Sequence, residues 1–345
     1  IQGTDGIRRE IKLAKESECR GSTPLKIFLE KGWITEEFME LYVYCWVKKQ
    51  LKIKSTSSKK STFTIGWDPR DPSGVFTEAV VRGVRKAGGE AQVLGVVPTP
   101  LVPLFMLHEG VEGGIMVTAS HNPKDQNGIK LFLPFHGMKP LPSDDADLTQ
   151  DLLKQSFSVL NKLRLKGKRT DCRQKALELF RHFSLTPENS WIESPKTLKD
   201  LILVVDPAFG ALKEIAAPIF REAGVGKVIE INAGKNGAVN LRSGVAELEG
   251  CPRITADMIL KPAGLFHSHK AIVKLFELGR AHRKSTELGK KRVAGAIFDA
   301  DGDRFFCLQY DPFQDTLWVL SGDETAILQA QHLVSRFPEK YCGSL

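Results

Sequence analysis

Paired cysteines are missing from this sequence. The six cysteines of the 345-residue chain are scattered, and no two of them form a C-x-x-C motif. This spacing argues against a structural zinc site and against a disulfide framework. We therefore expect free thiols in the reducing environment of the cytoplasm.

Long apolar runs are missing as well. The longest apolar stretch near the N-terminus, residues 41–47, is far too short to span a membrane. No signal peptide is visible, so we expect no membrane partner. The chain begins with Ile1 and stops just after an incipient element, and we expect it to be cut at both ends.

Nucleic-acid motifs are also absent, although the net charge is +8. Much of the excess charge comes from three short basic runs, within residues 48–60, 162–169 and 290–292. No aromatic residues interleave these runs, and no nucleic-acid motif accompanies them. We interpret the runs as solvated faces and loops, and we expect no nucleic-acid partner. A basic balance also suits an anionic small-molecule substrate.

The composition, 42% hydrophobic and 26% charged, is that of a globular protein, and the length allows two or three domains.

The middle of the chain contains an internal repeat, the Asp-Pro echo. In each copy a strand ends in Asp-Pro, a helix follows and stops at Ala-Gly, and a second strand comes next. The two copies are residues 64–97 and 201–231. Strand–helix–strand units of this length predict parallel α/β sheets.

We therefore predict an α/β fold. It has two similar three-layer α/β domains with mixed, mostly parallel sheets, plus the first elements of a third domain. The predicted domains are residues 1–186, 187–320 and 321–345, with a proline-containing linker at 184–195. Outside the echo, helices are expected at residues 34–51, 98–108, 144–160, 171–183 and 322–336, and strands at 113–117, 129–133, 293–298, 305–310 and 317–320.

Three carboxylates follow the strand expected at residues 293–298. Asp299, Asp301 and Asp303 stand at alternate positions, where like charges repel one another unless a cation lies among them. Oxygen-only ligation by a compact loop suits a hard divalent ion such as Mg²⁺. The loop therefore predicts a magnesium site, with a merely structural acidic turn as the alternative.

Spacing also decides between two other interpretations of this acidic loop. An EF-hand needs Gly at the sixth position and Glu at the twelfth, but here the Gly is fourth and the twelfth residue is Tyr310. A haloacid-dehalogenase-type phosphatase has D-x-D-G after an apolar strand, with the first Asp as nucleophile. That family expects Thr or Val after the Gly, where this chain has Asp303. The EF-hand is excluded and the phosphatase is weakened.

A second polar segment, residues 118–123, follows the short strand expected at 113–117. In α/β folds the chemistry lies outside the carboxyl ends of strands. Small and polar neighbours around Ser120 could hydrogen-bond a phosphate, so this serine is a candidate nucleophile or phosphate binder, and a turn residue is the alternative. His121, taken alone, is more often a loop histidine than a catalytic base.

Two further segments contain basic side chains and are weaker candidates for the site. Asn127 and Gly128 are expected to form a turn into the strand that carries Lys130, for which a charge at a strand edge is the alternative. Residues 3–8 form a glycine-punctuated loop with Arg8, and it is neither a Walker A motif nor a Rossmann fingerprint. Alone, this loop is weak evidence for phosphate binding.

Together these segments resemble the α-D-phosphohexomutases, a family of phosphoglucomutases, phosphomannomutases and phosphoglucosamine mutases. Four motifs occur in the family's order at fitting distances, and the serine and acidic motifs are highly specific. The resemblance spans essentially the whole chain and includes the Asp-Pro echo, since the family's first domains share one topology. The motifs are Gly3-Thr4-Asp5-Gly6-Ile7-Arg8, Thr118-Ala119-Ser120-His121-Asn122-Pro123, Asn127-Gly128-Ile129-Lys130 and Asp299-Ala300-Asp301-Gly302-Asp303-Arg304.

The resemblance implies an intramolecular phosphotransferase acting on a phosphorylated hexose. It would interconvert the 1-phosphate and 6-phosphate of glucose or mannose, through a phosphoserine and a bisphosphorylated sugar. By resemblance Ser120 is the phosphoserine, and one Mg²⁺ contacts its phosphate and the carboxylates of Asp299, Asp301 and Asp303.

The resemblance also implies the cationic residues of the centre. Lys130 is the candidate for proton transfer and Arg8 is its partner. Phosphoryl transfer needs the charge on the transferred oxygens to be neutralised, which a divalent ion with Arg304 and Lys130 would do. Further residues implied at the centre are His121, and Thr118 and Asn122 as phosphate or substrate ligands.

The resemblance is incomplete at the C-terminal side. The family's sugar-reading loop, of the G-E-x-S-G-H type, and its distal phosphate loop, of the R-x-S-x-T/N-E-P type, do not occur here. The preferred hexose and the oligomeric state therefore stay open, and we expect little mutase turnover from this piece alone. A non-catalytic phosphosugar-binding fragment and a metal-dependent phosphatase remain as alternatives.

Overall fold

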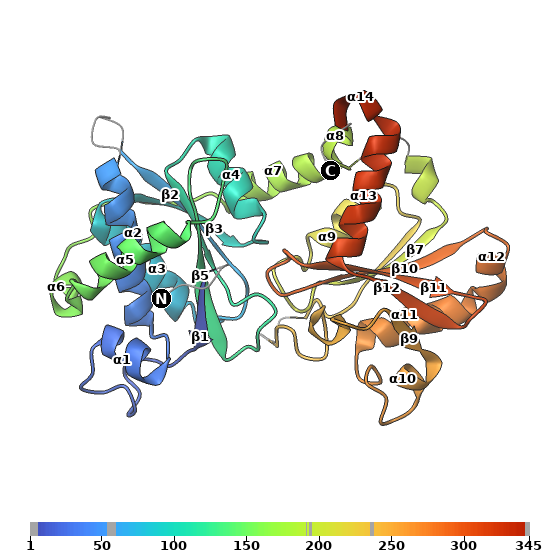
Figure 1. The fold of residues 1–345 in the computed structure, drawn as a ribbon, viewed down its shortest axis with the longest axis horizontal. Coiled ribbons are helices and arrows are strands. Elements are labelled where there is room, and N and C mark those ends of the chain that lie inside the picture. The colour runs from blue at the N-terminus through green and yellow to red at the C-terminus, as the bar shows by residue number, and fades with distance from the viewer. Residues whose placement is uncertain (1–5, 54–59, 191, 193–194, 235–237, 342–345) are drawn as a thin grey trace. The chain divides into compact units, whose positions relative to one another are not determined.

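The computed structural model describes residues 6–53, 60–190, 192, 195–234 and 238–341. The chain forms two compact units: residues 1–186 with 237–239, and residues 187–236 with 240–345. Each unit contains one six-stranded mixed sheet with helices, so the predicted α/β class is confirmed (Figure 1). Residues 321–345 group with the second unit, and their assignment to a third domain stays a prediction.

The first sheet has the strand order β1-β5-β4-β2-β3-β6. Strands β4, β2, β3 and β6 are parallel neighbours, whereas β5 and β1 are added antiparallel at one side. The strands are β1 (Ile7–Glu10), β2 (Thr62–Trp67), β3 (Glu90–Val96), β4 (Gly113–Val117), β5 (Gln126–Phe132) and β6 (Arg169–Asp171).

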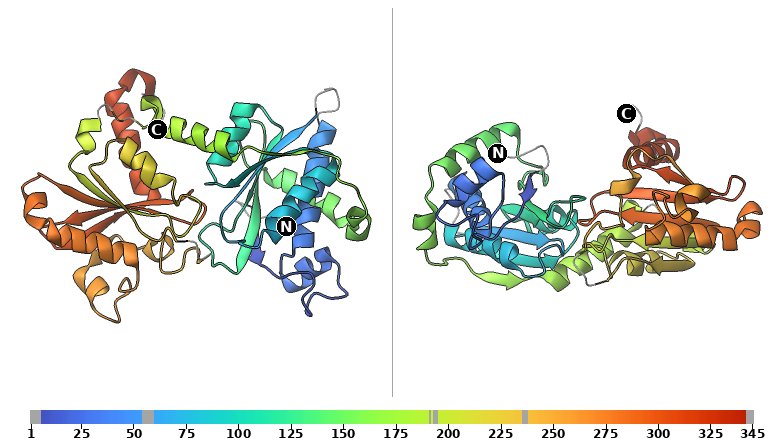
Figure 2. Two further views of the ribbon diagram at one scale, coloured as in Figure 1. Left: turned by 180° about the vertical axis from the view of Figure 1, so that it is seen from behind. Right: turned by 90° about the horizontal axis from the view of Figure 1, so that it is seen from below.

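Helices cover both faces of this sheet. Alternate residues of β4 enter different apolar clusters: Ile115 and Val117 pack with α2 and α3, and Met116 packs with α4 and α7. The unit therefore has the three predicted layers, with α2, α5 and α6 on one side of the sheet (Figures 1 and 2). The helices are α1 (Pro24–Lys31), α2 (Glu36–Ile53), α3 (Val75–Ala87), α4 (Leu101–Glu109), α5 (Pro142–Leu153), α6 (Phe157–Asn161) and α7 (Arg173–Leu185).

The predicted turn at Asn127 and Gly128 is wrong, because both residues lie within β5 and pair with β1. Glycine is needed here for close approach of two backbones: a Cβ on Gly128 would lie 1.9 Å from the carbonyl oxygen of Ile7. Glycine is therefore required at position 128 by the close approach of β1, and not by a turn.

The single helix predicted at 144–160 is also wrong. It is two helices, α5 and α6, separated by Ser156 in an extended conformation. Leu152 and Leu160 are buried in one apolar cluster on either side of the break. The apolar pattern therefore continues through the break and could not reveal it.

The second sheet has the order β8-β7-β10-β11-β12-β9, with β8, β7 and β10 parallel and the remaining neighbours antiparallel. Across both sheets, five neighbouring pairs are parallel and five are antiparallel. The strands are β7 (Leu201–Asp206), β8 (Lys227–Glu230), β9 (Arg253–Thr255), β10 (Arg292–Phe298), β11 (Phe305–Asp311) and β12 (Thr316–Leu320).

Helix α11 packs on one face of the second sheet, and α9 and α13 lie on the other (Figure 1). The largest apolar cluster of this unit lies under α11. No helix in the described ranges is long and apolar enough to cross a membrane. The helices are α8 (Pro187–Ser190), α9 (Ala216–Glu222), α10 (Ala256–Leu260), α11 (Lys270–Ala281), α12 (Arg283–Glu287), α13 (Gly322–Arg336) and α14 (Pro338–Tyr341), with 3₁₀ turns at Pro195–Leu198 and Ala246–Leu248.

The two sheets share a central pattern. The order β3-β2-β4-β5 in the first unit corresponds to β8-β7-β10-β11 in the second, with the same sequence of parallel, parallel and antiparallel pairs. Strands β4 and β10 therefore occupy equivalent places, and so do the loops that follow them. The Ser120 loop follows β4, and the acidic loop follows β10.

Close packing of α11 on β11 gives a stability prediction. A Cβ on Gly279 would lie 2.3 Å from the Tyr310 ring. Gly279→Ala should lower the free energy of unfolding by about 1–3 kcal/mol through overpacking, although Ala is the better helix former by about 1 kcal/mol. Urea unfolding measures this change.

Gly322→Ala is the matched control, because a Cβ on Gly322 would have Phe305 O as its nearest neighbouring atom, 4.0 Å away. This control should be neutral or slightly stabilising. Equal stability of the Gly279 variant and the parent chain would contradict the packing described for α11.

Candidate functional site

The Ser120 loop starts at the carboxyl end of β4. Thr118 and Ser120 are buried, and the hydroxyl oxygen of Thr118 accepts a hydrogen bond of 2.8 Å from the Ser120 N–H. Ser120 has a left-handed backbone with φ of 54°. A residue other than glycine in this conformation costs about 1–2 kcal/mol, so the surrounding contacts must hold it there.

A buried ion pair holds the loop from the neighbouring strand. Asp68 directly follows β2, and both of its carboxylate oxygens lie 2.9 Å from Nε of Arg70. Asp68 also accepts a hydrogen bond of 2.5 Å from the Thr118 hydroxyl. The side chains of Asp68 and Arg70 are fully buried. Asp68 therefore connects β2 to the start of the Ser120 loop.

Arg70 also hydrogen-bonds the backbone of the Ser120 loop. Its Nη2 donates to the Ser120 carbonyl at 2.5 Å, and its Nη1 donates to the Gln126 carbonyl at 3.0 Å. Asn122 adds a side-chain bond of 2.7 Å to the Gln126 amide oxygen. One guanidinium thus fixes both ends of the segment from Ser120 to Gln126, and the half-buried His121 lies between these anchors.

Lys130 and Arg8 lie on the same face of the sheet as Thr118. Thr118 N donates to the Gly128 carbonyl, and Gly128 pairs with Arg8 on β1, so Arg8, Gly128 and Thr118 form one row across three strands. Side chains two residues apart on a strand share a face. Lys130, two residues after Gly128, therefore lies on this face beside the row.

The edge-charge alternative for Lys130 is wrong, because β5 is an interior strand and Lys130 is completely buried. Arg8 lies on strand β1, so the expectation that it ends a loop is corrected. Gly6 has φ of 126°, and a Cβ there would lie 2.4 Å from the Ile129 carbonyl. Gly3, Thr4 and Asp5 of the glycine-punctuated segment lie outside the described residues.

The acidic loop follows β10 in the second unit. Each of Asp299, Asp301 and Asp303 offers a carboxylate oxygen, and these three oxygens lie within 4.8 Å of one another. Asp299 and Asp301 are fully buried, and Asp303 is exposed. An all-oxygen set with two buried charges at this spacing fits a hard divalent cation.

The backbone of this loop is held tightly. The Arg304 N–H donates to Asp299 Oδ1 at 3.1 Å, and Gly302 provides a left-handed turn with φ of 67°. The Ala300 carbonyl accepts from Ala211 N at 2.7 Å, and a Cβ on Gly210 would lie 2.2 Å from that carbonyl oxygen. The backbone between the carboxylates is therefore packed against the loop that follows β7.

Asp206 is the second unit's counterpart of Asp68. It ends β7, is fully buried, and accepts hydrogen bonds from Ala208 N at 2.8 Å and Gly244 N at 3.0 Å. Burial raises the pKa of the Asp206 carboxyl, while the nearby His269 ring and these N–H groups oppose the rise. His269 Nε2 lies 3.8 Å from the Asp206 carboxylate.

Arg304 lies beside a cavity. It forms an ion pair with Glu249. A cavity of about 710 Å³ is lined by residues that include Asp303, Arg304 and the first residues of α13. The open space beside the acidic loop is therefore bordered by charges of both signs.

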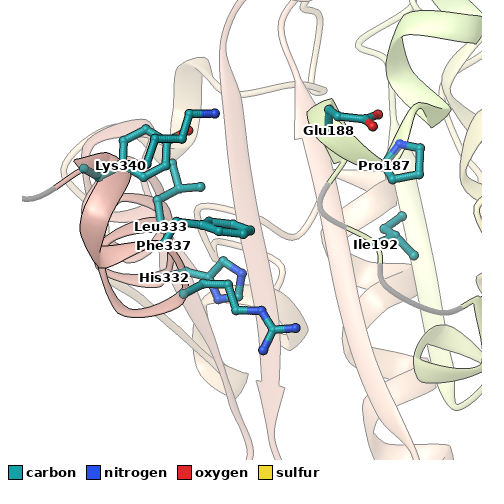
Figure 3. Close-up of a pocket in the computed structure, with 9 residues that line it drawn as sticks. Pro187, Glu188, Ile192, His332, Leu333, Phe337 and Lys340 are labelled. Carbon is teal, nitrogen blue, oxygen red and sulfur yellow. The ribbon is translucent and has the colours of Figure 1, made fainter.

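A second cavity, of about 370 Å³, contains no predicted site residue. Leu333 and Phe337 of the α13–α14 region point across it toward Pro187 and Ile192 (Figure 3). Its lining is largely apolar, and we assign no chemistry to it.

Sequence reasoning missed several residues that shape the two loops. Asp68 and Asp206 appeared only as marks of the Asp-Pro echo, although this repetition was the available signal for their role. Arg70 stands two residues after Asp68 and gave no signal of burial. Asn240 accepts a hydrogen bond from Ala300 N in the acidic loop, and His269 contacts the Gly244 carbonyl. Both residues are distant in sequence from the groups that they contact.

The chain is similar to several known proteins. Residues 26–158 match the family described as phosphoglucomutase/phosphomannomutase, alpha/beta/alpha domain I. The chain is 27% identical over 335 residues to a phosphoglucosamine mutase of Pseudomonas putida, covering 96% of this chain and 59% of that protein. It is 35% identical over 185 residues to a phosphoglucosamine mutase of Mycobacterium leprae, covering 53% of this chain and 38% of that protein.

A solved structure shares the fold. A phosphoglucomutase/phosphomannomutase family protein of Burkholderia thailandensis aligns with a TM-score of 0.56 at 19% identity, over 87% of this chain and 56% of that chain. The chain thus spans somewhat more than half the length of the Pseudomonas and Burkholderia proteins.

The buried ion pair of Asp68 and Arg70, which supports the Ser120 loop, gives a second prediction. Arg70→Met leaves the Asp68 carboxylate buried without its ion-pair partner, which typically costs about 3–5 kcal/mol of stability. Urea unfolding should show this loss. Asp68→Asn combined with Arg70→Met should lose less than the sum of the two single changes, because the two side chains act as one unit.

Arg82→Met is the matched control, since the Arg82 side chain is 40% exposed and its partner Glu40 keeps Lys86. It should cost at most about 1 kcal/mol. Equal losses from the Arg70 and Arg82 variants would contradict the bracing role of the buried pair.

Proposed function

Because the chain belongs to the α-D-phosphohexomutase superfamily, we propose that it carries the phosphoserine half and the metal half of a mutase centre. The reaction is interconversion of hexose 1-phosphate and hexose 6-phosphate through a bisphosphorylated sugar. The supporting observation is the equivalence of the two loops, each at the end of the strand beside a buried aspartate. The activity of the whole protein is part of this proposal.

Ser120 is the proposed phosphoryl carrier. The phosphoryl group passes from Ser120 Oγ to a hydroxyl oxygen of the hexose phosphate, so the serine P–O bond breaks and a new P–O bond forms on the sugar. The hydroxyl proton leaves to a base, and Lys130 is the candidate on the same sheet face, beside Arg8. The freed Ser120 Oγ takes up a proton in turn and becomes a hydroxyl again. The sugar then turns over and returns its other phosphoryl group to Ser120.

Asp299, Asp301 and Asp303 are the proposed ligands of a Mg²⁺ ion. This ion supplies charge neutralisation for the transferred phosphoryl oxygens when it is bound. The chain's own contribution is to hold two buried carboxylates and one exposed one within 4.8 Å. Arg304, which follows the third carboxylate, is the proposed ligand of the serine phosphate, while Thr118 and Asn122 shape the loop around it.

The substrate class is a phosphorylated hexose. Glucose and mannose phosphates are proposed from the motifs, and the names of the Pseudomonas and Mycobacterium relatives add glucosamine phosphate to the candidates. A kinetic panel of glucose, mannose and glucosamine phosphates decides among them.

A phosphorylation experiment tests the proposed function. The chain is incubated with glucose 1,6-bisphosphate and Mg²⁺, and intact-mass spectrometry counts the phosphoryl groups transferred. We expect one group, located on Ser120 by fragmentation, and none in Ser120→Ala. Ser61→Ala, a change at another buried serine of the same unit, should leave the transfer intact.

The phosphatase alternative makes a different prediction. An aspartate nucleophile would keep phosphate-releasing activity in Ser120→Ala and lose it in Asp299→Asn. That outcome, or phosphoryl transfer to a residue other than Ser120, would refute the mutase proposal. Absence of any transfer to the parent chain would also count against it.

A further inference from the structure

Asn240 reaches the backbone between two of the proposed metal ligands. Its side-chain oxygen accepts a hydrogen bond of 3.0 Å from the N–H of Ala300, the residue between Asp299 and Asp301. The carbonyl of the same Ala300 accepts from Ala211 N at 2.7 Å. Both polar backbone groups of Ala300 are therefore fixed by segments outside the acidic loop.

The segment that carries Asn240 is itself anchored at both ends. Asn240 N donates to the Ala208 carbonyl at 3.1 Å, and Gly244 N donates to the buried Asp206 carboxylate at 3.0 Å. His269 Nε2 lies 3.2 Å from the Gly244 carbonyl. The buried Asp206 and His269 thus hold the Gly244 end of the segment. Ala208, in the loop that follows β7, holds the Asn240 end.

The backbone of this segment is unusual. Asn240 has φ of 60°, Arg242 has φ of 49°, and Gly244 has φ of 73°. Left-handed residues other than glycine persist only where surrounding contacts determine them. Asparagine is among the residues that tolerate this conformation, so position 240 combines a permitted backbone with the acceptor that Ala300 needs.

Rigid carboxylates distinguish between divalent ions. Mg²⁺ requires near-ideal octahedral geometry at about 2.0–2.1 Å, whereas Ca²⁺ accepts flexible geometry at about 2.3–2.6 Å. A fixed Ala300 peptide holds the backbone origins of Asp299 and Asp301 in one relation. Loss of that restraint should penalise the smaller and more demanding ion more strongly.

We propose that Asn240 is a positioning residue that sets the preference of the acidic loop for Mg²⁺ over Ca²⁺. It acts through the Ala300 peptide and does not touch the ion. This inference rests on the proposed role of Asp299, Asp301 and Asp303 as metal ligands.

Asn240→Gly is the decisive variant, because glycine keeps the left-handed backbone and removes the side chain that carries the acceptor. Mg²⁺ and Ca²⁺ affinities are measured separately by titration calorimetry on the 345-residue chain. We expect the Mg²⁺ affinity to fall by about tenfold or more, in the range known for residues that orient metal ligands. The Ca²⁺ affinity should change by much less, so that the ratio of the two affinities falls.

Two further variants separate positioning from general loosening. Asn240→Asp keeps an acceptor oxygen and tolerates the same backbone, so it should preserve the affinity ratio of the parent chain. Glu214→Gly is the matched control: Glu214 is an exposed residue of the same unit with the same φ of 60°. It should leave the ratio unchanged even if it lowers thermal stability.

The outcomes distinguish this inference from the metal site itself. Failure of the parent chain to bind Mg²⁺, or unchanged binding in Asp301→Asn, would overturn both the proposed ligands and the role of Asn240. Normal metal binding with the same affinity ratio in Asn240→Gly would overturn the role of Asn240 alone. An equal loss of ratio in Glu214→Gly would do the same.

Discussion

A buried aspartate at the end of one strand holds the loop at the end of the next, and this interaction occurs in both units. In the first unit Asp68 binds the Thr118 hydroxyl at 2.5 Å and so supports the Ser120 loop. In the second unit Asp206 binds Gly244 N at 3.0 Å, and the segment from Asn240 to Gly244 supports the acidic loop. Because β2 is parallel to β4 and β7 is parallel to β10, each aspartate reaches the loop beside it.

The two aspartates differ in what compensates their burial. Asp68 has a buried Arg70, which also binds the carbonyl of Ser120. Asp206 has two backbone N–H groups and the His269 ring nearby, without an arginine contact of this kind among the described residues. Burying a charge is costly unless it is paired and hydrogen-bonded. The first loop is thus organised by a guanidinium, and the second by backbone donors and the Asn240 side chain.

Local chemistry made much of this architecture predictable. The Asp-Pro echo and the glycine stops gave two α/β units, and Gly88 does end α3 with a left-handed φ of 103°. The alternating carboxylates and the Ser120 segment identified the two loops, since each follows a short apolar strand.

What the sequence could not show depends on contacts between distant residues. Gly128 is a strand residue because the backbone of Ile7 approaches it closely. Lys130 lies on an interior strand because β1 pairs with the edge of β5 that faces away from β4, and no local pattern predicts that pairing. Asn240 reaches Ala300 across 60 residues of sequence. Supports of this kind depend on the order of the strands in each sheet, which local sequence patterns do not encode.

The proposed function makes the serine loop and the acidic loop two halves of one reactive centre. The most direct test is the Mg²⁺ affinity of the chain with phosphoserine at position 120, compared with unmodified Ser120. Tighter Mg²⁺ binding by at least about tenfold is expected, because the phosphate adds close to two negative charges beside the same ion, and Asp301→Asn should remove the gain. Equal Mg²⁺ affinities with and without the serine phosphate would contradict a shared centre.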